Sequence, residues 1–326
     1  MSAAALFRIA VATLAFAGVS TAHANDAWPG RQPIMMLLPA GPGGSSDALA
    51  RLLAEQFGTR LKQSVVVQNR PGAAGNIGMA QAARARPDGY SIALSWTGPM
   101  ATNLALYRDV GFDPKRDFAP IGMIGCTPNV LAVSQASPIG SLSGFIDHAR
   151  SRAGSTFYGS AGIGSSWHLA GEMVNRKASN GLVHVPFTQP GQALTEMLGG
   201  RLDAIFPVLP MTVPHVRAGT IRALAVFSKA RSTVLPEVPT TAELGYPDLV
   251  SDTCFALLAP AGTPADIIGR LNSTLAEIVE MPSMKERMRD LGLTVTTGAP
   301  SLLTDYLSEE IPRQAALVAA SGAKAD

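Results

Sequence analysis

The sequence contains few charged residues, few aromatic residues and very little cysteine. Asp, Glu, Lys and Arg make up 15% of the chain, and 26 basic side chains nearly balance 24 acidic ones. No run of basic residues occurs, so the chain lacks the cluster of positive charge that binds nucleic acid or an anionic membrane. The two cysteines, Cys126 and Cys254, are too few for a disulfide scaffold. These absences exclude nucleic-acid partners and small disulfide-rich folds.

Apolar runs long enough to cross a membrane are also absent. Near the start, Arg8 precedes an apolar run over residues 9–19, and small residues flank a cleavage point at residues 22–24. The run is shorter than the roughly 20 apolar residues of a transmembrane helix, and the pattern is typical of an export signal. We therefore expect a signal peptide over residues 1–24 and a mature protein in the periplasm.

Motifs for nucleotide and metal chemistry are missing. There is no G-x-x-x-x-G-K-[ST] loop, and residues 41–43 lack the final glycine of a dinucleotide fingerprint. His168 and Glu172 lie four residues apart on a predicted helix, but no second metal-ligand motif accompanies them. We expect neither a metal nor a cofactor.

An enzymatic alternative is a serine hydrolase. Ser45 or Ser165 could combine with His168 and Asp203, but the chain has no G-x-S-x-G elbow to present a strained nucleophile. We therefore expect a binding protein rather than an enzyme.

Strands and helices alternate through most of the chain, which predicts α/β architecture with mainly parallel sheets. Short apolar runs bounded by turn residues predict strands over residues 34–38, 65–68, 91–95, 130–134, 156–159, 182–186, 204–206, 221–227 and 254–259. Apolar residues at helical spacing predict helices over residues 49–57, 142–152, 169–177, 192–198, 265–279 and 302–318, and another that ends near residue 83.

The length of the chain favours two domains. We expect a first lobe of residues 25–125 plus 252–326, a second lobe of residues 126–251, and a hinge where the chain crosses between them twice. Cys126 and Cys254 each fall near a crossing, so we hypothesise that they approach one another and form a disulfide. Two buried free thiols remain the alternative.

Two glycine- and serine-rich turns, one in each predicted lobe, each join a strand to a helix. Ligands of open α/β sheets bind at the carboxyl ends of strands, so both turns should face the cleft. The candidate ligand-binding residues of the first turn are Pro39, Ala40, Gly41, Pro42, Gly43, Gly44, Ser45, Ser46 and Asp47. Those of the second turn are Ser160, Ala161, Gly162, Gly164, Ser165, Ser166, Trp167 and His168.

Such turns suit a carboxylate. Glycine allows close approach to the backbone, and the free amides of a helix start carry about half a positive charge. Neither turn contains Lys or Arg, so amides, hydroxyls and water would hold the anion reversibly. The alternative is that both are merely tight turns.

Further candidates flank these turns. Thr97 and Gly98 follow a predicted strand, and Phe187 with Trp96 and Trp167 could accommodate an apolar or aromatic ligand body. Asp203 could select an amine or hydroxyl group on the ligand, or could cap the strand that follows it.

At these residues the chain resembles the Bug (TctC-type) receptors, the periplasmic solute-binding components of tripartite tricarboxylate transporters. The resemblance rests on the turn from Pro39 to Asp47 and on residues 50–55, 66–78 (VVQNRPGAAGNIG), 87–90 (PDGY), 158–160, 168–172 (HLAGE), 184–187, 198–200, 222–226 and 257–264 (LLAPAGTP). It implies a periplasmic binding protein-like fold (type II, Venus-flytrap) of two α/β lobes that close on a carboxylate. It also implies delivery to a permease with one large and one small subunit, or to a sensor.

The chain departs from the family pattern at four places. Trp167 replaces a frequent histidine, residues 187–189 replace Tyr-Lys-Gly, Pro207 replaces an aspartate and Cys254 replaces a tryptophan. These departures predict a more apolar far end of the pocket. The monomeric receptor we expect would bind a small organic acid with an aromatic or apolar body.

Overall fold

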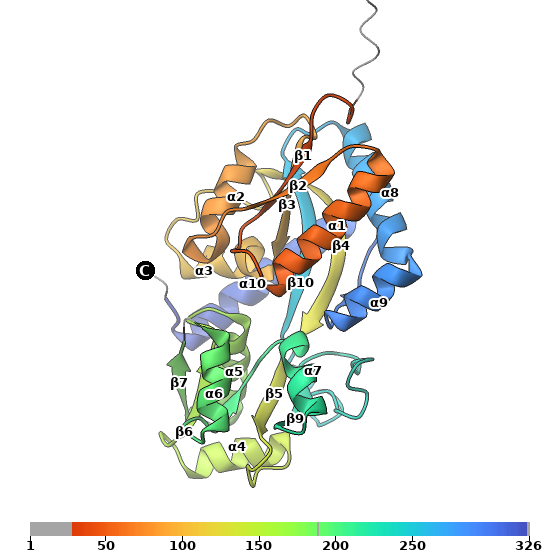
Figure 1. Ribbon diagram of the computed structural model, residues 1–326. Helices are drawn as coiled ribbons and strands as arrows, with labels where there is room; N and C mark the ends of the chain where they lie inside the picture. The colour runs from red at the N-terminus through yellow and green to blue at the C-terminus, as the bar shows by residue number, and fades with distance from the viewer. Residues whose placement is uncertain (1–27, 188, 325–326) are drawn as a thin grey trace, which may run out of the picture.

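The computed structural model describes residues 28–187 and 189–324. The expected signal peptide, residues 1–24, lies outside this range. The described chain builds two β-sheets, each covered by helices, and Figure 1 shows the elements of the first sheet above those of the second. We call the first sheet and its helices the first lobe, and the second sheet and its helices the second lobe. None of the helices described here is both long and apolar enough to cross a membrane.

The first sheet has the strand order β11-β4-β10-β3-β1-β2. Its parallel half consists of β1 paired with β2 and β3, whereas β10 runs antiparallel to β3 and β4. Its strands are β1 (Ile34–Leu38), β2 (Val65–Asn69), β3 (Ser91–Trp96), β4 (Phe118–Pro128), β10 (Asp252–Pro260) and β11 (Thr294–Val295).

Helices cover both faces of the first sheet. Leu49, Leu53 and Phe57 recur at helical spacing on α1 and are buried against one face, together with residues of α8 and α9. The other face packs against α2, η2 and α10 (Figure 1). These elements are α1 (Ser45–Leu61), η1 (Ala73–Gly75), α2 (Asn76–Ala83), η2 (Gly98–Thr102), α3 (Asn103–Leu106), α8 (Ala265–Glu280), α9 (Pro282–Asp290) and α10 (Ser301–Ser321).

The second sheet repeats this plan with the order β7-β6-β8-β5-β9. β6 pairs in parallel with β7 and β8, whereas β5 runs antiparallel to β8 and β9. Its elements are β5 (Val130–Ser134), α4 (Leu142–Ser151), β6 (Thr156–Ser160), α5 (Ser166–Lys177), β7 (Leu182–Pro186), α6 (Pro190–Leu198), β8 (Ala204–Ile205), α7 (Leu209–Arg217) and β9 (Ile221–Val226).

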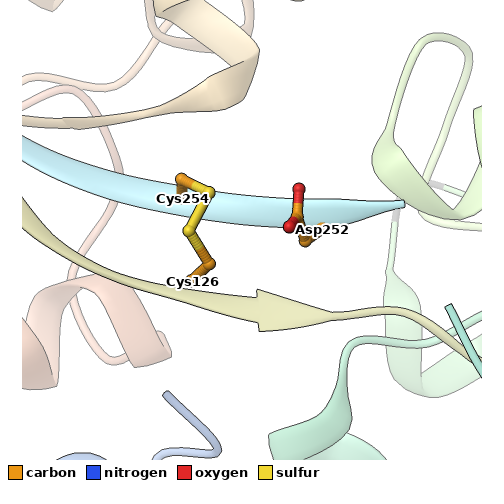
Figure 2. A group of neighbouring side chains, drawn as sticks. All are labelled: Cys126, Asp252 and Cys254. Atoms are coloured by element: carbon orange, nitrogen blue, oxygen red, sulfur yellow. A yellow bond between two sulfur atoms is a disulfide. The ribbon is translucent and has the colours of Figure 1, made fainter. Parts of the chain in front are cut away.

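The two sheets are joined where β4 leads into β5 and where the chain returns from β9 to β10. Asn129, which is fully buried, lies at the first crossing and contacts the second. Its backbone amide donates to Ser251 O at 2.9 Å, and its Oδ1 accepts from Ser251 Oγ at 3.1 Å. Cys126 and Cys254 are partners across β4 and β10 and form a disulfide (Figure 2). The hypothesis of a bridge at the hinge strands is therefore confirmed in this structure.

The sheets are mixed rather than mainly parallel, because the strands leading into and out of the hinge run antiparallel to their neighbours. Patterning also missed β4, whose Pro120, Gly122, Gly125 and Pro128 interrupt any apolar run. Helix α7 was missed for a similar reason, since it begins with Leu209-Pro210 and contains Pro214.

Candidate ligand-binding cavity

A cavity of about 440 Å³ lies where the two lobes meet. The first lobe supplies the ends of β1 and β3, the segment around η1, and residues of η2 and α3. The second lobe supplies the turn before α5 and the start of that helix, while the hinge strand β10 and helix α10 close another side. Carboxyl ends of parallel strands in both sheets therefore face a shared space, as expected of an open α/β fold.

The structure brings part of the predicted site to this cavity. The predicted residues that line it are Pro39, Ala40, Thr97, Gly98, Ala161, Gly164, Ser165, Ser166 and Trp167. The predicted residues outside its lining are Gly41, Pro42, Gly43, Gly44, Ser45, Ser46, Asp47, Ser160, Gly162, His168, Phe187 and Asp203.

The first turn is held together by Asp47. The Asp47 carboxylate accepts hydrogen bonds from the Gly43 amide at 3.0 Å and from Asn69 Nδ2 at 3.0 Å, and it pairs with Arg51 at 3.0 Å. The Arg51 side chain, then the Gly43 amide and Asn69, lower the pKa of Asp47 to about 2. Asp47 is thus an anion that stabilises its own turn, and only Pro39 and Ala40 of this turn line the cavity.

The second turn presents the start of α5 to the cavity. Ser165 Oγ caps this helix by accepting from the His168 amide at 3.3 Å, and it donates to Gly162 O at 2.7 Å. The Gly162 and Gly164 amides are also occupied, by Ser160 Oγ and by His168 Nδ1. For the amides of Ser166 and Trp167, no partner is found in the described part of the chain. These two amides are free donors at the cavity wall.

Two stacked imidazole rings, those of His168 and His184, pack beside this turn. The rings of His168 and His184 lie 3.9 Å apart, and Ser160 Oγ is 2.6 Å from His184 Nε2. Burial, followed by the neighbouring His168, lowers the pKa of His184 to about 3, and burial lowers the pKa of His168. Both imidazoles are neutral near pH 7, so His168 Nδ1 can accept a hydrogen bond from the Gly164 amide.

The serine-hydrolase alternative with Ser165 as the nucleophile finds no geometric support. Ser165 Oγ donates to a backbone carbonyl, and His168 Nδ1 accepts from a backbone amide. Asp203 lies at the amino-terminal end of β8 in the second sheet, where its Oδ2 accepts a hydrogen bond from the Phe157 amide at 2.7 Å. Asp203 precedes β8 and so lies opposite the carboxyl ends of the parallel strands. Of the two roles expected for Asp203, this contact is that of a cap on the strand.

Aromatic and apolar side chains form much of the remaining wall. Trp167 is 4% exposed and packs in the core of the second lobe while lining the cavity, and Trp96 lines it from the first lobe. Leu106 and Leu169 meet there from opposite lobes. Phe187 packs against the second core, away from the cavity lining.

Several lining residues were missed by sequence reasoning. They are Pro71, Gly72, Ala74 and Gly75 around η1, Thr102, Asn103, Leu106 and Tyr107 after η2, Ile163 and Leu169 beside the second turn, Ser251, Asp252 and Thr253 at the hinge, and Gln314 and Leu317 on α10. One signal was available for the first group. The segment Pro71 to Gly75 is a glycine-rich strand-to-helix turn, like the two turns that were selected.

Asp252 supplies the only charge among the described residues that line the cavity. Burial raises the pKa of this carboxyl group, with nearby Arg313 opposing and Glu310 adding to the shift. The carboxylate lies close to Cys126 and Cys254, and the three side chains form a compact group (Figure 2). Because the two sulfur atoms are bonded to each other, they offer no thiolate ligands for a metal ion.

Comparison with known proteins identifies the family of the chain. Residues 49–323 match the model of the tripartite tricarboxylate transporter family receptors, TctC. The chain belongs to this family of receptors. The predicted resemblance is thereby confirmed, and members of this receptor family are solute-binding proteins.

The chain is also similar to a named protein and to two solved structures. It is 36% identical to protein BugT of Bordetella pertussis over 95% of both chains. It is 33% identical to Rpa4515 of R. palustris, solved with adipate, with a TM-score of 0.81 over 91% of this chain and 99% of that one. The periplasmic binding protein BugD is 31% identical, with a TM-score of 0.77 over 90% and 99% of the two chains. These structures confirm the predicted fold of two α/β lobes.

Proposed function

We propose that this receptor captures a small organic carboxylate in the periplasm and delivers it, without chemical change, to a two-subunit membrane permease. The observation that carries the proposal is the placement of the start of α5 at a cavity shared by both lobes. The amides of Ser166 and Trp167 have no protein partner in the part of the chain described, and they lie at the positive end of a helix dipole.

Binding without a basic side chain suits a transport receptor. No Lys or Arg lines the cavity in the described chain, so the carboxylate would be held by amides, hydroxyls and water. Hydrogen bonds between neutral amides and an anion contribute roughly 1.5 to 3 kcal/mol each. This is less than the free energy lost when one partner of a fully buried ion pair is removed. Such a site holds its ligand firmly enough for capture and releases it when the lobes open.

The remaining wall favours an apolar or aromatic ligand body. Trp96 and Trp167 offer flat faces from opposite lobes, and Leu106 and Leu169 add aliphatic surface. A carboxylate whose body fills this space would bury apolar area on lobe closure, which contributes about 25 cal/mol per Å². Rpa4515 holds adipate, a carboxylate with an apolar chain, and this agrees with the proposed ligand class.

The permease that receives the solute would consist of one large and one small subunit, as in tripartite transporters. We also propose that residues 1–24 direct export and that the receptor acts as a monomer. The division into residues 25–125 plus 252–326 and residues 126–251 is our proposal for the two moving bodies. A second candidate role is that of a receptor for a signalling partner, in which the cavity would act in the same way.

Native mass spectrometry of the purified protein tests the proposal. We expect a small acid to be released on denaturation, and titration with aliphatic, aromatic and hydroxylated acids to change the fluorescence of Trp96 and Trp167. Trp28 lies outside the cavity lining, so Trp28→Phe is the control that should keep this signal. Absence of any carboxylate ligand, or product formation from the bound acid, would contradict the proposal.

A further inference from the structure

Asp252 is unexpected in a cavity that receives an anion. It is the first residue of hinge strand β10, and no Lys or Arg is among the described residues that line the cavity. An ionised carboxylate at this wall repels a second carboxylate and attracts a positively charged group. The residue therefore bears on which solutes the cavity admits.

Arg313, the cation that most lowers the pKa of Asp252, is paired with another carboxylate. Arg313 of α10 donates to Glu310 through Nε at 2.7 Å and Nη2 at 2.6 Å, and through Nη1 to Val250 O at 3.0 Å. Glu310 is thus the ion-pair partner of Arg313. Within residues 28–187 and 189–324, no ion pair to Asp252 is found.

Other titratable groups around Asp252 form no ion pair with it among the residues described. Lys229, in the segment after β9, has the smallest effect of the groups that shift the pKa of Asp252. Burial raises the pKa of Tyr306, so this phenol is neutral, and it shares a hydrogen bond of 2.8 Å with Thr97 Oγ1. The disulfide beside Asp252 is uncharged (Figure 2). Across β4, β10, α10 and the segment after β9, the unpaired charge at the cavity wall is negative.

The aromatic residues of the cavity point to the same kind of ligand. Trp96, Trp167 and Tyr107 line the cavity together with Asp252. The faces of aromatic rings attract cations by roughly 0.5 to 2 kcal/mol, most strongly for tryptophan. A carboxylate and several aromatic rings around one small space form a suitable environment for a protonated nitrogen.

We propose that Asp252 receives a protonated amine of the solute, so that the receptor binds zwitterions whose carboxylate lies at the start of α5. The inference rests on the proposed function, since it keeps the carboxylate site and adds the second charge. The cavity then contains complementary groups for both ends of the solute: free amides of Ser166 and Trp167 for the anion, and Asp252 for the cation. A solute with an apolar chain between its two charges fits the wall between them.

Three probes of similar chain length test this selection: 6-aminohexanoate, hexanoate and adipate. Isothermal titration of the wild type should give an affinity for 6-aminohexanoate at least about tenfold higher than for hexanoate or adipate, because only the first carries a cation. Asp252→Asn should reduce this preference to about twofold or less, mainly through a loss of affinity for 6-aminohexanoate. Asp248→Asn, which alters an exposed carboxylate paired with Lys177 outside the cavity, should keep the preference.

The pH dependence supplies a second readout. The raised pKa of Asp252 means that the ionised form is present above that pKa and is lost as the pH falls through it. The preference for 6-aminohexanoate should therefore decline on acidification, starting above the pH at which an ordinary aspartate is protonated, and the Asp252→Asn protein should lack this decline.

The outcomes separate the inference from the proposed function. If adipate or hexanoate binds the wild type as tightly as 6-aminohexanoate, or if Asp252→Asn keeps the preference, the inference is wrong and carboxylate capture still stands. If none of these acids nor any other carboxylate binds the folded wild type, carboxylate capture fails and the zwitterion assignment fails with it.

Discussion

Leu106 of α3 packs against Gly164 in the turn before α5, and this contact joins the two lobes at the cavity wall. A Cβ atom added at Gly164 would overlap Leu106 Cδ1. Leu106 also meets Leu169 and Val318 in a small cluster formed by α3, α5 and α10. The approach of the lobes therefore depends on a residue without a side chain at position 164.

Gly164→Ala should weaken ligand binding by keeping the lobes apart. We expect about a tenfold loss of affinity, because overpacking typically costs 1 to 3 kcal/mol. Gly162→Ala is the matched control: Gly162 also has a positive φ, but a Cβ there meets nothing closer than Phe187 O at 3.7 Å. Addition of Leu106→Ala to Gly164→Ala should restore part of the affinity, as measured by titration calorimetry. Equal losses for both glycine variants would show that backbone strain alone is responsible.

Removal of the disulfide should destabilise the protein. Cys126 and Cys254 are 128 residues apart in sequence, so the bridge closes a long loop in the unfolded chain. The double variant Cys126→Ser/Cys254→Ser should lose about 2 to 4 kcal/mol of unfolding free energy in urea titrations. Wild type unfolded with a reductant should match the variant, and two alkylated thiols in the untreated native protein would contradict the bridge.

The fold was largely predictable because its strands are bounded by local signals. β1, β5 and β7 occur at the predicted residues, since proline, glycine or polar residues mark their ends. β4 has no such local signature, and its extended conformation depends on pairing with β10 and β11, which come more than a hundred residues later. Local patterning therefore misses an element such as β4, which distant partners specify.

The site was predictable only in part, for a related reason. The second turn lines the cavity through Ser165, Ser166 and Trp167, as its position after a strand predicts. Asp203 precedes its strand, and this position already indicates the opposite edge of the sheet. Asp252 begins a hinge strand and reaches the cavity only because the chain returns to the first sheet, a relationship that no local motif encodes.

Neutral His184 should make the second lobe sensitive to acid. Burial and His168 lower the pKa of His184 from 6.5 to about 3, so the folded state disfavours the imidazolium that the unfolded chain readily forms. The stabilisation is present above pH 6.5 and is lost as the pH falls from 6.5 towards 3. His184→Gln should therefore lose less unfolding free energy than the wild type between pH 7.5 and pH 4.5. Parallel decreases for both proteins would contradict the assigned pKa.

The most direct test of carboxylate capture removes one backbone donor at the start of α5. Ser166 is the first residue of this helix, where proline is tolerated, and Ser165 already has the extended backbone that precedes proline (φ −62°, ψ 157°). Ser166→Pro removes the amide hydrogen, whereas Ser166→Ala removes only the hydroxyl group. With the carboxylate identified by native mass spectrometry, titration calorimetry should show at least about a tenfold loss of affinity for Ser166→Pro and less than about threefold for Ser166→Ala. Equal affinities for the two variants would contradict the account, because the amides at the start of α5 would then not hold the ligand.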